Sequence, residues 1–103
     1  MLQLKKPLAF LDIEATGSNV TTDRIVEIAI VKHLPDGART VKRKIINPQM
    51  PIPQAIIDIH GITNEMVQSA PVFKTAAHEI KQFLDGCDLA CYNDWNRWLG
   101  IRT

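Results

Sequence analysis

The stretch PLAFLDIEATG, residues 7–17, ends an apolar run with two acidic side chains, Asp12 and Glu14. An ionised carboxylate is costly to remove from water unless a partner group or a metal ion meets it. On a β-strand, residues two apart project from the same face, so Asp12 and Glu14 lie together with Ile13 on the opposite face. This segment therefore decides both the fold class and the candidate site.

Two carboxylates on one face repel each other, and each makes the other harder to ionise. A divalent cation relieves this repulsion, and Mg²⁺ or Mn²⁺ prefers such hard oxygen ligands. The spacing alone is weak evidence, because 11 acidic residues among 103 give about one such pair by chance. The alternative is that the acids cap the following turn and form an ion pair with Arg24. Since open α/β sheets gather ligands at the carboxyl ends of strands, we predict metal binding there, with a hydroxyl from Thr16 and close backbone approach at Gly17.

The composition indicates one small domain, because 103 residues with 46% hydrophobic side chains can form one core. The formal charge of +1 excludes recruitment of a nucleic acid by a broad basic field. Five basic residues nevertheless gather in a predicted hairpin, and we interpret them as a solvated strand face: Lys32, Arg39, Lys42, Arg43 and Lys44.

No apolar run approaches the roughly 20 residues of a membrane span, and we expect no signal peptide and no membrane partner. Cys87 and Cys91 would lie about 13 Å apart along a strand, too far for a disulfide. We interpret them as small buried side chains in a reducing compartment, and we expect a cytoplasmic protein.

The apolar and turn patterns predict a mixed sheet with helices against it, in the order β-β-β-α-α-α-β. Residues 8–13 suit a central strand covered on both faces. Residues 24–34 and 39–46 form an antiparallel pair around the turn sequence PDG, with the latter strand at the sheet edge. Two short helices follow. The first covers about residues 53–59, and the second begins at the N-cap Thr63 and ends at residue 67. An amphipathic helix over 72–84 ends at Asp85-Gly86 and precedes a short buried strand in CDLACYN, residues 87–93.

The sequence contains five ordered blocks: AFLDIEATG, DRIVEIAIVK, INPQMPIPQAIIDIHGIT, APVFKTAAHEIKQFL and DLACYN. In order and spacing, these blocks resemble the four-acid (DEDD) 3′→5′ exonucleases of the DNA polymerase III epsilon, ribonuclease T and oligoribonuclease type. The resemblance covers about residues 7–93 and implies a ribonuclease H-like α/β fold, with a divergent tail over 94–103. We therefore expect residues 1–103 to form the N-terminal part of an exonuclease domain.

The resemblance implies release of nucleotides from the 3′ end of single-stranded DNA or RNA, with two divalent ions, Mg²⁺ or Mn²⁺. It assigns catalysis and metal binding to Asp12, which touches both ions, and to Glu14, which touches one. It places the backbone of Ala15, Thr16 and Gly17, together with His60, beside the terminal nucleotide. On its own sequence evidence, His60 is a helix-end residue that interacts with the helix dipole. Glu27 also has a family counterpart, and we interpret it as structural, paired with Arg24 or a lysine.

The chain departs from the family pattern after Asn93. A second aspartate is expected four or five residues later, where Arg97 and Trp98 stand, and Asp94 is the nearby carboxylate that could replace it. The His-x4-Asp block of the family is absent. We therefore expect at most one weakly held ion.

A second function remains open, namely a catalytically inactive domain that binds a nucleotide, a single strand or a protein partner. A glycosidase fits less well, because acids two residues apart on one strand suit metal sharing better than flanking a sugar bond. The sequence around Trp95, Trp98 and Leu99 has an apolar helical stripe. We expect this stripe, or a second chain in a homodimer, to cover apolar surface left exposed around LDIEA and DLACY.

Overall fold

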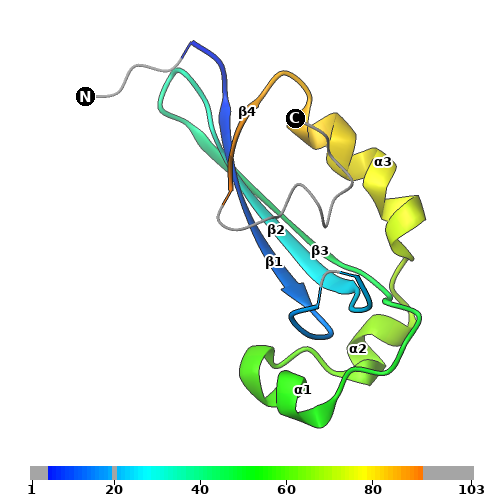
Figure 1. The fold of residues 1–103 in the computed structure, drawn as a ribbon. Helices are drawn as coiled ribbons and strands as arrows, with labels where there is room; N and C mark the ends of the chain where they lie inside the picture. Colours follow the sequence, from blue (N-terminus) through cyan, green and yellow to red (C-terminus); the bar gives the residue numbers. More distant parts are fainter. Residues whose placement is uncertain (1–4, 20, 92–103) are drawn as a thin grey trace.

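The computed structural model describes residues 5–19 and 21–91, which form a mixed sheet with helices packed against it (Figure 1). The strands stand in the order β3-β2-β1-β4. The predicted succession β-β-β-α-α-α-β is confirmed, with these bounds: β1 Leu8–Ala15, β2 Ile25–His33, β3 Arg39–Ile45, α1 Gln54–His60, α2 Asn64–Gln68, α3 Phe73–Leu84 and β4 Asp88–Cys91.

Strand β1 is the central element of the sheet. It pairs antiparallel with β2, so that Asp12 lies opposite Ala29 and Glu14 opposite Glu27, and it pairs parallel with β4. Strand β3 lies at the edge, as predicted. The PDG turn sets the register of β2 and β3, because the Leu34 N–H donates to the Ala38 carbonyl at 2.8 Å.

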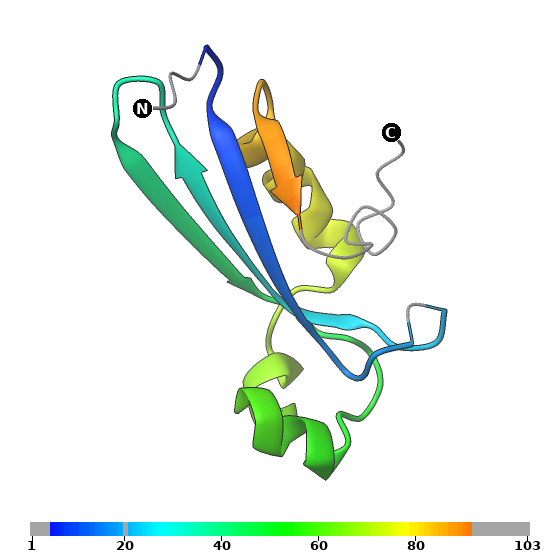
Figure 2. The same cartoon turned by 60° about the vertical axis from the view of Figure 1, so that its left-hand side comes forward.

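Helix α3 covers one face of this sheet (Figures 1 and 2). The core between them is formed by side chains that are at most 5% exposed: Ala9, Leu11, Ile25, Ile28, Ile30, Ile46, Ala76 and Ile80. Among the described residues no helix lies on the opposite face, where the Phe10 ring is 36% exposed. The prediction that both faces of β1 are covered is therefore wrong for the described part of the chain.

Strand β4 is an edge strand of the described sheet, and the prediction that it is buried is wrong. Asp88 is exposed and Leu89 is 36% exposed, because β4 has a neighbour only at β1. Cys87 precedes the strand as a partly buried free thiol. Asn93, Asp94, Trp95 and Trp98 lie outside the described residues, so the tail contacts and the homodimer stay predictions.

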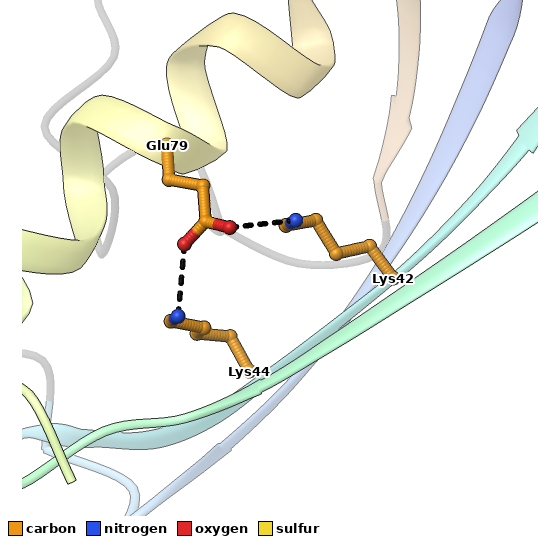
Figure 3. A network of polar contacts seen from close by, with 3 residues as sticks. All are labelled: Lys42, Lys44 and Glu79. Atoms are coloured by element: carbon orange, nitrogen blue, oxygen red, sulfur yellow. Dashed lines mark ion pairs between the residues drawn. The ribbon is translucent and has the colours of Figure 1, made fainter.

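Ion pairs hold α3 against the strand pair β2–β3 (Figure 3). The two carboxylate oxygens of Glu79 form separate ion pairs, one with Lys42 Nζ at 2.8 Å and the other with Lys44 Nζ at 2.8 Å. Hydrogen bonds from Lys42 and Lys44 lower the pKa of Glu79 to about 2. The ammonium of Lys32 lies 4.1 Å from the centroid of the Phe83 ring. Three of the five basic residues predicted to lie on a solvated strand face therefore contact α3 instead.

Helix α3, with 12 residues, is the longest described helix. Its apolar side chains Ala76 and Ile80 face the sheet. Within residues 5–19 and 21–91, no helix combines the length and the apolarity that crossing a membrane requires.

Helices α1 and α2 lie beyond the carboxyl end of β1 (Figure 1). They pack around a second, smaller core formed by Val26, Ile52, Ile62 and Val67. The predicted N-cap is confirmed, because the Thr63 hydroxyl accepts the Met66 N–H at 3.2 Å. Helix α1 ends at Gly61, whose positive φ of 77° suits glycine. In this arrangement the last residue of α1 lies beside the last residue of β1.

The α3 interface predicts a contrast between two identical substitutions. Ile80 is 3% exposed in the core, whereas Ile59 on α1 is 78% exposed. We expect Ile80→Ala to lower the free energy of unfolding by about 2–5 kcal/mol through lost burial and a cavity. Ile59→Ala should change it by no more than about 0.5 kcal/mol. Urea unfolding followed by circular dichroism measures both, and equal losses would contradict the assigned core.

Candidate active site

Asp12 and Glu14 lie on the face of β1 opposite α3, as the strand alternation predicts. Asp12 is exposed and Glu14 is partly buried, whereas Ile13 between them packs against the core. Strand β1 extends to Ala15, two residues beyond the predicted end, so both acids belong to the strand. Their direction is therefore fixed by pairing with β2 on one side.

The charges around Glu14 favour a bound cation. Partial burial is the largest cause that raises the pKa of Glu14, and the negative charges of Asp12 and Glu27 raise it further, whereas His60 lowers it. Glu27 pairs with Arg43 at 3.6 Å, so the predicted partner, Arg24 or a lysine, is wrong, and its structural role stays a prediction. Among the described residues no ion pair joins Asp12 or Glu14 to Arg24.

The backbone that follows the two acids is held by the next turn. Thr16 is 1% exposed. Its hydroxyl donates to Asp23 Oδ1 at 2.8 Å and accepts the Arg24 N–H at 3.0 Å. The Thr16 hydroxyl, proposed from the sequence as a group offered to a ligand, is thus engaged within the protein.

Gly17 permits a close approach, and the group that approaches is the Asp23 carboxylate. A Cβ atom at residue 17 would lie 2.7 Å from Asp23 Cγ. Sequence reasoning missed Asp23. A local signal for it is the turn-forming sequence that begins at Asn19 and places the Asp23 carboxylate shortly before strand β2.

His60 ties the end of α1 to the end of β1. Its Nδ1 accepts the Ile62 N–H at 3.0 Å, and this bond assigns the ring proton to Nε2. Nε2 then donates to the Ala15 carbonyl at 3.2 Å. The helix-end position predicted for His60 is confirmed, since it is the last residue of α1. The structure also brings His60 into contact with Ala15, whereas its position beside a terminal nucleotide stays a prediction.

The described residues place two carboxylates, Asp12 and Glu14, on one strand face and do not form a complete metal ligand set. Within residues 5–19 and 21–91, no group of three or more His, Cys, Asp or Glu side chains is placed to share an ion. Asp94, the third predicted ligand, lies outside the described residues. The donor chemistry of Asp12 and Glu14 fits Mg²⁺ or Mn²⁺, with water or phosphate oxygens completing the coordination.

Comparison with known proteins gives one family. A family model described as Exonuclease (RNase_T) matches residues 9–96. The chain is 35% identical over 91 residues to the 3′-5′ exonuclease DinG of Bacillus subtilis (strain 168), covering 86% of this chain and 10% of that protein. It is 36% identical over 93 residues to a DNA polymerase III subunit epsilon-like protein of Rhodobacter capsulatus, covering 86% of this chain and 13% of that protein. The chain thus spans about a tenth of the length of these relatives.

The fold matches solved structures of exonuclease I. The E. coli enzyme in complex with a dT13 oligonucleotide superimposes with a TM-score of 0.77 at 15% identity, over 92% of this chain and 23% of that one. The product-bound structure of exonuclease I gives a TM-score of 0.78, over 93% and 24%. The prediction of a ribonuclease H-like mixed sheet is confirmed, with this chain corresponding to the N-terminal part of the fold.

The raised pKa of Glu14 predicts how stability depends on pH. In the folded state Glu14 holds its proton to a higher pH than in the unfolded chain, so its contribution is present below pH 4.5 and is lost as pH rises through the folded pKa. We therefore expect Glu14→Gln to become more stable than the wild type as pH rises through this window. Urea unfolding at a series of pH values measures the difference.

The same substitution at Glu79 is the matched control, because it should act in the opposite direction. Its folded pKa is lowered to about 2, so the wild type gains stability above pH 4.5 and loses it as pH falls toward 2. Glu79→Gln should therefore be less stable than the wild type at neutral pH, by an amount that salt reduces. Glu14→Gln and Glu79→Gln changing stability in the same direction would contradict these charge environments.

Proposed function

This chain belongs to the exonuclease family, and on that premise we propose that it hydrolyses the 3′ end of single-stranded nucleic acid at a metal site formed by Asp12 and Glu14. One observation carries the proposal, namely that the two carboxylates share one face of β1 and that Asp12 helps to raise the pKa of Glu14. Asp12 and Glu14 would hold a divalent ion, which would supply Lewis-acid stabilisation of phosphate charge.

The residues at this site would have two separate functions, binding of the ion and positioning of the backbone. Asp12 is exposed and accessible to an ion, while Glu14 is partly buried, so its carboxylate has fewer competing water contacts. The backbone from Ala15 to Gly17 follows directly and would contact the terminal nucleotide. His60 and Asp23 hold this backbone through Ala15 and Thr16, so its position is set before a ligand arrives.

Two comparisons support the direction of cleavage and the form of the substrate. The Bacillus subtilis relative is named a 3′-5′ exonuclease, and an exonuclease I structure of this fold holds a dT13 oligonucleotide. We therefore propose a single-stranded 3′ end as the substrate. Whether the sugar is deoxyribose or ribose is an outcome of the experiment below.

A second candidate is binding of the same 3′ end without cleavage. It is favoured by the ligand set, because the described residues place two carboxylates, and not a larger cluster, around the site. Two carboxylates neutralise one divalent ion and leave no further charge for another. Hydrolysis by a two-ion clamp would then need ligands from outside the described residues.

The two candidates are separated by Mn²⁺-dependent digestion of a 5′-labelled single strand, with DNA and RNA in parallel. Hydrolysis at this site predicts a ladder that shortens from the 3′ end and disappears when the metal is chelated. Asp12→Asn should slow cleavage at least about 100-fold, because even losing a group that supports a metal ligand costs 10–100-fold.

The matched control is Asp36→Asn in the β2–β3 turn, which makes the same chemical change far from the site. It should leave the cleavage rate unchanged, whereas cleavage that persists in identically purified Asp12→Asn would reveal a contaminating nuclease. Binding of the strand without shortening would support the second candidate. Neither binding nor shortening by the wild type would contradict both.

A further inference from the structure

The turn after β1 is organised around a single carboxylate, that of Asp23. Its Oδ1 accepts the Thr16 hydroxyl at 2.8 Å, and its Oδ2 accepts the Asn19 N–H at 3.0 Å. Asp23 forms no ion pair with any described residue. Both oxygens of a charged group are therefore used to fix the turn, and hydrogen bonds to a carboxylate are stronger than neutral ones.

The Thr16 hydroxyl has a defined direction. Its oxygen accepts the Arg24 N–H at 3.0 Å, and its single proton can reach either Asp23 Oδ1 at 2.8 Å or Met50 Sδ at 3.6 Å. The carboxylate is the stronger acceptor and the shorter contact, so the proton points to Asp23. This connects Asp23 to a threonine that is 1% exposed and directly follows the strand carrying the two acids.

Asp23 also contacts the chain sterically at Gly17. A Cβ atom there would lie 2.7 Å from Asp23 Cγ and 2.9 Å from Oδ1, distances that real Cβ atoms do not show. The backbone of residue 17 therefore packs directly on the carboxylate. Two residues earlier, the Ala15 carbonyl accepts a hydrogen bond from His60 Nε2 at 3.2 Å. The segment from Ala15 to Gly17 is fixed from two independent elements.

From this geometry we propose that Asp23 is the positioning residue for recognition of the 3′ end. Its carboxylate contacts Thr16, Asn19 and Gly17, so it would act by setting the orientation of the peptide groups from Ala15 to Gly17 that face the 3′ end. The inference rests on the proposed function, because it assigns Asp23 a part in binding the same 3′ end. A displaced backbone would weaken contacts to the end more than contacts along the strand.

The test compares affinities of the full 103-residue chain for two 5′-labelled oligothymidylates, one ending in a 3′-hydroxyl and one in a 3′-phosphate, with Ca²⁺ as the divalent ion. The ratio of the two dissociation constants is the measured quantity. Partial unfolding of a variant raises both constants by the same factor and leaves the ratio unchanged, so a purely structural defect does not move it.

We expect the wild type to prefer the 3′-hydroxyl end. Asp23→Asn should reduce that preference about tenfold, because the asparagine NH₂ group would face either the Thr16 hydroxyl or the Asn19 N–H, which are both donors to the carboxylate. Thr16→Val, which removes the hydroxyl, should act alike. Asp36→Asn, the same change in another turn, should retain the wild-type ratio.

The outcomes separate this inference from the function on which it rests. A wild-type preference that Asp23→Asn retains would overturn the role of Asp23 and leave the proposed function standing. A wild type that binds both strands without preference would overturn this inference alone, and a wild type without affinity for either strand would overturn the proposed function and this inference together.

Discussion

The alternation of side chains along β1 is the constraint on which the rest of the structure depends. The same strand buries Ala9 and Leu11 against α3 and must therefore present Asp12 and Glu14 on its other face. A slip of one residue in pairing with β2 would exchange the two faces and bury both carboxylates. The energy of the α3 core thus holds two like charges side by side, an arrangement that the acids themselves oppose.

The backbone after β1 depends on polar groups rather than on the core. Asp23 holds Thr16 and packs against Gly17, while His60 holds the Ala15 carbonyl from α1. These contacts join the β1–β2 turn to the small core of α1 and α2, which lies beyond the end of the sheet. The acids and the segment beside them are thereby fixed by different parts of the fold, one apolar and one polar.

The features that the sequence predicts correctly are those that depend on residues close together in the chain. The PDG turn, the Thr63 cap and the shared face of Asp12 and Glu14 follow from local conformation, and all are present. The wrong predictions depend on segments distant in sequence. Glu27 pairs with Arg43 because β3 lies beside β2, and Leu89 is exposed because β4 has one neighbour. Asp23 was missed for a different reason: Thr16 is only seven residues away, but their contact forms only when the turn from Asn19 folds back.

Nuclear magnetic resonance of the ¹⁵N-labelled chain during titration with Mn²⁺ tests most directly whether Asp12 and Glu14 form a metal site. Paramagnetic Mn²⁺ broadens the amide signals nearest to it. A site on β1 predicts that the signals from Asp12 to Ala15 broaden first, with Asp12→Asn abolishing this selectivity. Earlier broadening at the exposed acids Asp36, Asp58 or Asp85 would contradict the assignment of the metal to β1.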